Sequence, residues 1–349
     1  EDQQAIREYL QKHRLSAFVA NGSVLPRKSG VSDLPMKGSV PFVSPVSMEE
    51  TIVLPHKGQI KGMAIRQGIT LIVGGGYHGK STLLRALELG VYNHIRGDGR
   101  EYVITDDTAL KLRAEDGRSI CKTDISMFVN NLPNGRDTAA FSTEDASGST
   151  SQAANIAEAL EAGSRVLLMD EDTSATNFMV RDELMQAVIA RDQEPITPFL
   201  ERAQDLWQMA GVSLILVVGS CGAYFHIADH VVQMNCYRAR DITAQARVVL
   251  EGRPVPALSA PGFRLPGGRR VVDLSGDSQV RKNYRGDGYR QERLKVKCFG
   301  KTAFTVGDRE LDLRYVEQLV DGGQTRALAF MVRYARENLS GLGVAEIAQ

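Results

Sequence analysis

Gly74-Gly-Gly-Tyr-His-Gly-Lys-Ser81 is the stretch of this sequence that decides its fold. It matches the pattern G-x-x-x-x-G-K-[ST] in full, and it lies between an apolar run at 69–73 and a helical pattern at 81–89. A strand, a glycine-rich turn and a helix N-terminus in this order bind phosphate groups through backbone N–H donors and the helix dipole. We therefore predict a phosphate-binding loop (P-loop) in an α/β fold.

The P-loop pattern assigns a role to each of its side chains. Lys80 is expected to reach the terminal phosphates, and the Ser81 hydroxyl to bind Mg²⁺. We favour ATP over GTP because the sequence contains no N-K-x-D guanine-recognition pattern. The predicted nucleotide-binding residues here are Gly74, Gly75, Gly76, Tyr77, His78, Gly79, Lys80, Ser81 and Thr82.

A second stretch, Arg165-Val-Leu-Leu-Met-Asp-Glu171, reads as a buried strand that ends in two carboxylates. At the carboxyl end of a parallel strand, Asp170 would bind Mg²⁺. Glu171 would polarise a water for attack on the γ-phosphate. A kinase that transfers the phosphoryl group is an alternative, although the strand-Asp-Glu order favours hydrolysis.

The wider pattern is an alternation of short strands and helices. We expect helices at 81–89, 151–162, 178–190 and 199–210 between strands at 69–73, 102–105, 165–169, 213–218 and 231–234. This alternation is typical of a parallel sheet with crossover helices. We predict a lead-in segment at 1–60 with a helix at 3–13, a nucleotide-binding domain at 61–240, and a basic C-terminal region at 241–349 with a strand at 293–299 and helices at 314–320 and 324–338.

Composition places this chain of 349 residues among globular proteins, with 43% hydrophobic residues and 42 basic against 42 acidic side chains. The apolar runs are too short to span a membrane. The four cysteines are far apart, which fits reduced thiols inside a cell and gives no metal-ligand spacing: Cys121, Cys221, Cys236 and Cys298. Because the chain begins at Glu1 without methionine, we expect a fragment or a processed form.

Between the two phosphate-site stretches lies Ala146-Ser-Gly-Ser-Thr-Ser-Gln152. It resembles the L-S-G-G-Q signature of ABC-class ATPases, with Ser147 and Gly148 on its S-G pair. Ser149 and Thr150 depart from that pattern. An N-capped amphipathic helix is the alternative interpretation. Residues 172–177 resemble the S-A-L-D loop of the same class, with Asn177 in place of aspartate.

The strand predicted at 213–218 ends in Gly219-Ser220, where ABC-class ATPases carry a histidine. We assign Ser220 to this catalytic position. A serine hydroxyl is a weaker γ-phosphate contact, so we expect slow hydrolysis. The Q-loop residue of this class would be Asn130 or Asn131.

Four strings together resemble the soluble ABC-class ATPase family of bacteria and some protists: GGGYHGKST, FSTEDASGSTSQAANI, LLMDEDTSATNF and VEQLVDGGQT. The resemblance runs from about residue 17 to residue 327. It implies an ATP hydrolase that acts as a head-to-tail homodimer, in which Ser147, Gly148 and Ser149 of one chain complete the P-loop site of the other. Nucleotide-binding subunits of transporters share these patterns and are the alternative.

Within this family, the resemblance extends to the member associated with mitochondrial RNA editing in kinetoplastids. It implies a multiprotein RNA-processing complex in the mitochondrial matrix, and a cytoplasmic location otherwise. Residues 264–297 carry ten basic and four acidic side chains with two interleaved tyrosines, which suits phosphates and unpaired bases. A solvated loop is the alternative. The predicted RNA contacts are Arg281, Lys282, Tyr284, Arg285, Tyr289 and Arg290.

Overall fold

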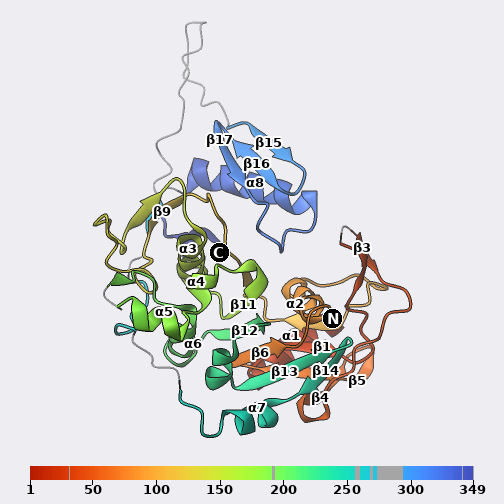
Figure 1. Cartoon of the computed structure of the whole chain (residues 1–349). Coiled ribbons are helices and arrows are strands. Elements are labelled where there is room, and N and C mark those ends of the chain that lie inside the picture. Colours follow the sequence, from red (N-terminus) through yellow and green to blue (C-terminus); the bar gives the residue numbers. More distant parts are fainter. Residues whose placement is uncertain are drawn as a thin grey trace, which may run out of the picture. The chain divides into compact units, whose positions relative to one another are not determined.

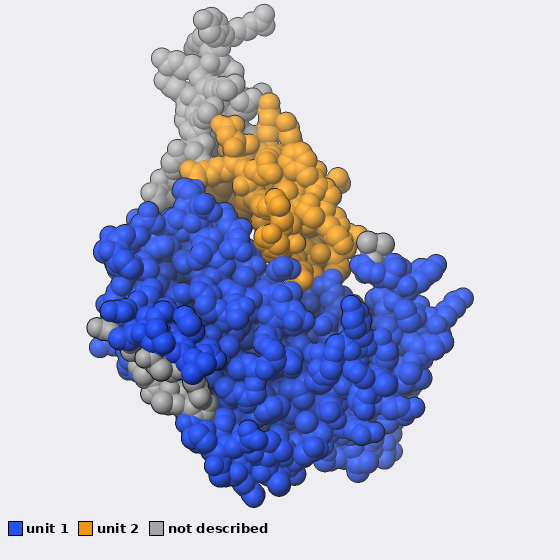
Figure 2. Space-filling view, in the orientation of Figure 1, with its two compact units in different colours: residues 1–266 blue, residues 267–349 orange. Residues whose placement is uncertain are grey.

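The computed structural model describes residues 1–30, 32–190, 193–255, 260–267, 270–272, 294–339 and 341–348. The chain divides into two compact units, Glu1–Pro266 and Gly267–Gln349 (Figure 2). The finer division predicted above, at residues 60 and 240, stays a prediction.

The first unit is built on a six-stranded sheet in the order β14-β13-β6-β12-β11-β8 (Figure 1). All neighbouring pairs are parallel except β13 and β14. The predicted parallel sheet is therefore confirmed, and β12 lies between the P-loop strand β6 and the acidic strand β11. The strands are β6 (Ile69–Val73), β8 (Leu110–Leu112), β11 (Val166–Asp170), β12 (Ser213–Val218), β13 (His230–Asn235) and β14 (Arg238–Asp241).

Both faces of this sheet are buried, as expected for parallel strands with crossover helices. Along β6, Ile69, Leu71 and Val73 pack on one side with residues of α3 and α6, whereas Ile72 packs on the other with residues of α2. This alternation explains the continuous apolar runs in the sequence. The helices are α2 (Lys80–Leu89), α3 (Gly148–Glu161), α6 (Phe199–Gln208) and α7 (Thr243–Leu250).

A four-stranded antiparallel sheet in the order β4-β5-β1-β7 forms a further layer, and its core cluster includes Ile6 and Leu10 of α1. The strand predicted at 102–105 belongs here and not to the parallel sheet, because β7 pairs with β1. An apolar run this short carries no information about its partner strand. The elements are α1 (Asp2–His13), β1 (Leu15–Ala20), β4 (Glu49–Leu54), β5 (Gly58–Arg66) and β7 (Val103–Thr105).

Shorter elements connect these layers, and one predicted helix is broken. The helix expected at 178–190 is two short helices, because the Asp182 carboxylate accepts the Leu184 N–H at 2.9 Å and starts a new one. The short elements are β2 (Arg27–Ser29), β3 (Ser32–Pro35), η1 (Val46–Met48), β9 (Ile120–Thr123), β10 (Phe141–Thr143), η2 (Glu171–Thr173), α4 (Thr176–Met179), α5 (Glu183–Val188) and η4 (Gly222–Ile227).

The second unit pairs a three-stranded antiparallel sheet with helix α8, around Phe304, Val306 and Ala329. The helix predicted at 324–338 is confirmed as α8. The one predicted at 314–320 is wrong, because the Asp312 carboxylate accepts the Arg314 N–H at 3.0 Å and the chain continues in turns. The elements are β15 (Val296–Phe299), β16 (Ala303–Val306), β17 (Arg309–Asp312), α8 (Gly322–Asn338) and α9 (Val344–Ala348). None of the described helices has the length and apolarity to span a membrane.

Candidate functional site

The P-loop joins β6 to α2, and two of its glycines are required by close packing. A Cβ atom at Gly74 would lie 2.4 Å from the Met234 carbonyl oxygen. At Gly79, with φ of 96°, it would lie 2.8 Å from the Tyr237 ring. Tyr77 also has positive φ and is fully exposed at the tip of the loop. The predicted loop therefore has the tight backbone that phosphate binding needs.

Lys80 and Ser81, in the first turn of α2, both point to the expected site. The Lys80 ammonium donates hydrogen bonds to the carbonyl oxygens of Gly74 at 2.8 Å and Gly75 at 2.9 Å, so it lies across the loop. The Ser81 hydroxyl donates to a carboxylate oxygen of Asp170 at 3.3 Å. Residues 89 positions apart in the sequence are thus neighbours, and their assignment to a Mg²⁺ site stays a prediction.

Asp170 ends β11 and is 6% exposed. Burial raises the pKa of this carboxyl, although the Ser81 hydroxyl and the Asp172 N–H oppose the shift. A buried carboxylate beside a hydroxyl supplies the oxygen ligands that Mg²⁺ prefers, so these residues fit the metal. The described residues include no group of three or more candidate metal-ligating side chains. The remaining ligands would come from nucleotide phosphates and water.

Glu171 is held by the end of the neighbouring strand β12. Its carboxylate accepts the N–H of Gly219 at 2.6 Å, the N–H of Ser220 at 3.0 Å and the Ser220 hydroxyl. Burial raises the pKa of Glu171, but these hydrogen bonds outweigh burial and hold that pKa below its usual value. Glu171 is therefore an oriented carboxylate, and Ser220 contacts it directly. The sequence analysis did not predict this contact between Glu171 and Ser220.

Helix α3 begins at Gly148, three residues before the predicted start, with Ser147 as its N-cap. Side chains of its first turns bind the loop that follows Glu171. The Ser149 hydroxyl donates to the Asn177 side-chain oxygen at 2.7 Å. The Gln152 amide donates to the Ser174 hydroxyl at 2.9 Å and accepts the Ala175 N–H at 2.8 Å. The two ABC-like segments therefore form one connected structure.

Of the three serines in the first turns of α3, at positions 147, 149 and 151, only Ser147 is exposed. Ser149 is 5% exposed, and Ser151 is fully buried with its hydroxyl donated to the Gly148 carbonyl at 2.8 Å. Ser147 is exposed at the end of the helix. In Figure 1, α3 lies apart from α2 and its P-loop. The assignment of Ser147, Gly148 and Ser149 to the site of a second chain stays a prediction.

The β13–β14 hairpin contacts the P-loop, which the sequence did not reveal. Cys236 and Tyr237 form its turn with φ of 47° and 63°. Such turns ordinarily use asparagine and glycine, so this pair has strained backbone. The Cys236 N–H donates to the His78 ring at 2.8 Å, and the Tyr237 N–H donates to the His78 carbonyl at 3.1 Å. This turn sets the Tyr237 ring beside Gly79.

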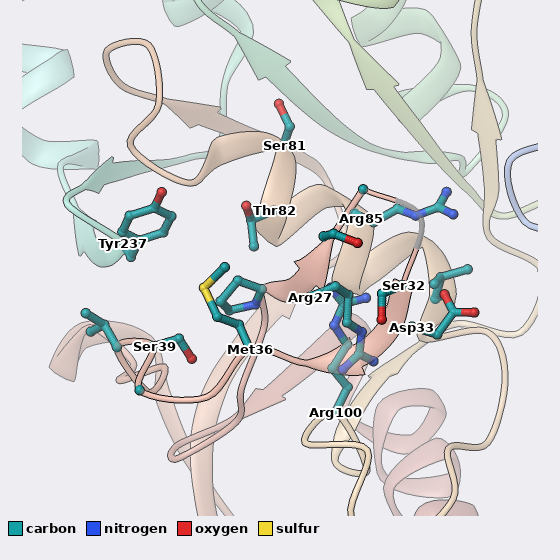
Figure 3. A pocket seen from close by; sticks show the side chains of 16 residues that line it. Arg27, Ser32, Asp33, Met36, Ser39, Ser81, Thr82, Arg85, Arg100 and Tyr237 are labelled. Carbon is teal, nitrogen blue, oxygen red and sulfur yellow. The ribbon is translucent and has the colours of Figure 1, made fainter.

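A pocket of about 590 Å³ lies next to this turn (Figure 3). The sequence analysis placed no pocket in the lead-in segment, yet residues 26–40 of that segment form most of the pocket wall. Ser81 and Thr82 connect the pocket to the P-loop. The lining residues are Pro26, Arg27, Ser29, Gly30, Ser32, Asp33, Met36, Gly38, Ser39, Val40, Ser81, Thr82, Arg85, Leu89, Arg100 and Tyr237.

Three further predictions concern the Q-loop residue, the cysteines and the RNA contacts. The Asn130 amide donates to the Ser126 carbonyl at 2.6 Å within its own loop, and Asn131 has φ of 54°, so the Q-loop assignment stays a prediction. All four cysteines are free. The predicted RNA contacts lie outside the described residues: Arg281, Lys282, Tyr284, Arg285, Tyr289 and Arg290.

Comparison with known proteins gives two family matches. Residues 1–263 match the P-loop domain of the ABC_ATPase family, and residues 295–348 match the MRB1590 C-terminal domain. The uncharacterized protein MJ1628 of Methanocaldococcus jannaschii is 29% identical over 255 residues, which are 68% of this chain and 54% of that protein. The chain thus spans about half the length of this relative.

Two solved structures of ABC transporter components are similar to this chain, with low TM-scores and low sequence identity. The ADP conformation of MJ1267, an ATP-binding cassette of an ABC transporter, has a TM-score of 0.39 at 12% identity, covering 68% of this chain and 96% of that one. The cbiO1 protein from Clostridium perfringens, part of the transporter complex cbiONQ, has a TM-score of 0.36 at 16% identity, covering 59% and 96%. At these TM-scores neither structure bears on the function of this chain.

Proposed function

Because the chain belongs to the ABC_ATPase family, we propose that it binds ATP with Mg²⁺ and hydrolyses the ATP at the interface of a head-to-tail homodimer. One observation carries the proposal. The ends of three adjacent strands, β6, β12 and β11, bring Lys80, Asp170 and Glu171 to one edge of the sheet. In open α/β sheets ligands bind at this edge.

Each of these residues has a defined task in hydrolysis. Lys80 exchanges its two loop carbonyls for the terminal phosphates of ATP. Ser81 and Asp170 would hold Mg²⁺, which would neutralise negative charge on the phosphates. Glu171 orients a water and takes its proton as the water oxygen bonds to the γ-phosphorus. The bond to the β-phosphate oxygen breaks, leaving ADP and inorganic phosphate.

The homodimer is proposed from the exposed end of α3. The first turn of a helix carries unpaired N–H groups and a favourable dipole for anions, and Ser147 adds an exposed hydroxyl. The Gln152 side chain links the loop after Glu171 to this helix through two hydrogen bonds. A phosphate from a second chain that contacts α3 would therefore act on a segment joined to the catalytic carboxylate.

We also propose RNA as the molecule on which the ATPase acts, within a mitochondrial RNA-processing complex. The support is the local excess of six basic residues at 264–297 and the match of residues 295–348 to the MRB1590 C-terminal domain. Phosphate contacts by lysine and arginine supply most of the affinity in such binding.

Two substitutions test the ATPase proposal. Lys80→Ala should weaken ADP binding, because the phosphates lose their cation. Glu171→Gln should keep ATP binding, abolish phosphate release and accumulate an ATP-bound dimer, detected by light scattering after gel filtration. Glu8→Gln, an exposed glutamate on α1, is the matched control.

The outcomes separate the alternatives. A Glu171→Gln variant that hydrolyses ATP at the parent rate would show that another group activates the water. Phosphate found on an acceptor instead of in solution would indicate a kinase. Hydrolysis that appears only after a membrane partner is added would indicate a transporter subunit.

A further inference from the structure

Charge is unevenly distributed in the pocket beside the P-loop. Three arginines line it, Arg27, Arg85 and Arg100, which we call the arginine wall. Asp33 is the acidic member of the described lining. In Figure 3 the arginine wall lies on the same side as Asp33, whereas Tyr237 and Ser39 lie on the opposite side.

Two members of the arginine wall have acidic partners inside the protein. Arg27 contacts both carboxylate oxygens of Asp98 at 2.8 Å through one guanidinium nitrogen. Arg85 pairs with Glu88, one turn further along α2. Their charges are therefore largely compensated before any ligand enters.

Arg100 has no such partner in the described part of the chain. It is 1% exposed, and two of its guanidinium nitrogens, Nε and Nη2, donate to the Leu25 carbonyl. The third nitrogen, Nη1, is buried and has no hydrogen-bond partner among the described residues. Burial lowers the pKa of Arg100 to about 10, so this guanidinium stays charged at neutral pH. Asp98 and Glu88 attract this charge without forming an ion pair with it, and a buried charge that lacks a direct partner is costly.

A second buried polar atom in the pocket is also without a partner. The Ser39 hydroxyl oxygen is buried and makes no hydrogen bond to any described residue. Of the four side-chain atoms in this state across the described residues, two belong to this pocket lining. Such atoms are uncommon in folded proteins, and each calls for an explanation. Polar atoms of a ligand in the pocket would be the missing partners for such groups.

We propose that Arg100 forms a second phosphate site in this pocket, separate from the P-loop. Guanidinium groups match the oxygens of phosphate with paired hydrogen bonds. Because Asp98 and Glu88 compensate Arg27 and Arg85, Arg100 supplies the attraction for the anion, and its unused Nη1 supplies the donor. The pocket is large enough for a phosphate-bearing small molecule. The phosphate is either a free ion or a second phosphate group on the ribose of the bound nucleotide.

In the first experiment, isothermal titration calorimetry measures the binding of inorganic phosphate to the full chain that carries Lys80→Ala. Removing Lys80 weakens the P-loop site and leaves the arginine wall intact. We expect one phosphate per chain, with affinity falling at least tenfold when Arg100→Met is added. Arg253→Met removes an exposed arginine outside the pocket and should change the affinity less than twofold.

The second experiment identifies the source of the phosphate, with Lys80 intact. If the second phosphate is on the ribose, adenosine 3′,5′-bisphosphate binds at least tenfold more tightly than AMP, and Arg100→Met removes the difference. If it is a free ion, phosphate and ADP bind the same chain together. Either result supports the site.

The proposal is overturned if Arg100→Met changes neither titration. If the Arg100→Met variant fails to fold, Arg100→Lys and Arg85→Met are tested in its place. The proposal is equally overturned if these variants change neither titration. ADP binding by Arg100→Met reports on the P-loop alone. A parent chain that binds phosphate at Arg100 but no ADP would therefore refute the ATPase and leave this site standing.

Discussion

Asp98 holds Arg27 of the arginine wall in place, and replacing Asp98 with asparagine should destabilise the fold. Its carboxylate binds Arg27 at 2.8 Å and the His94 ring at 2.8 Å, and it is 14% exposed. Burial acts to raise the pKa of Asp98, but the His94 and Arg27 contacts outweigh burial and lower the pKa from 3.8 to about 2. A difference of this size is worth about 2 kcal/mol of folding free energy at neutral pH, and solvent contact reduces the expected loss in Asp98→Asn to about 1–2 kcal/mol.

The sign of the pH dependence follows from the lowered pKa. Stabilisation by Asp98 is fully present above the unfolded pKa of about 4 and is lost as the pH falls toward the folded pKa of about 2. The difference between parent and Asp98→Asn should therefore be constant from pH 6 to pH 8. It should fall to about half that value near pH 3.

Urea unfolding followed by circular dichroism measures this difference at each pH. Asp107→Asn is the matched control, because Asp107 also binds an arginine but is 56% exposed. Exposed ion pairs contribute about 0–1 kcal/mol, so the control should change little. An Asp98→Asn loss no larger than that of the control, or one that does not shrink on acidification, would refute the described carboxylate geometry.

Three further predictions concern the ATPase and RNA. Ser220→Ala should slow phosphate release about fivefold without changing ADP affinity, because Glu171 loses one hydrogen bond worth about 1 kcal/mol in this exposed setting. Gln152→Ala should lower the free energy of unfolding by about 1–3 kcal/mol, because the half-buried Ala175 N–H loses its acceptor and the Ser174 hydroxyl loses a donor; an unchanged urea midpoint would contradict this. The RNA affinity of the full chain should fall log-linearly with salt concentration. The slope should flatten by about 0.7 per removed phosphate contact in a variant with alanine at Arg281, Lys282, Arg285 and Arg290. An unchanged slope would place the RNA contacts elsewhere.

Sequence patterns predicted those elements of the fold whose residue types follow from a contiguous motif or from burial. The P-loop could be located because its pattern is contiguous, although the contacts that require glycine at positions 74 and 79 come from the distant residues Met234 and Tyr237. The strands β11 and β12 could be located because burial on both faces requires unbroken apolar runs. The helix predicted at 314–320 was wrong because one carboxylate, that of Asp312, favours a turn over a helix start. Apolar periodicity does not register such a choice.

The pocket could not be predicted, because its residues depart from the ordinary preferences of their types. Arginine is almost never fully buried unless paired, yet Arg100 is 1% exposed and has no acidic partner among the described residues. Tyr237 adopts a left-handed backbone that tyrosine rarely takes. Ser39 buries a hydroxyl without a partner in the described chain. Departures of this kind cost stability and are expected at functional sites. That three of them line one pocket beside the P-loop is an argument, independent of any sequence motif, that this pocket binds a ligand.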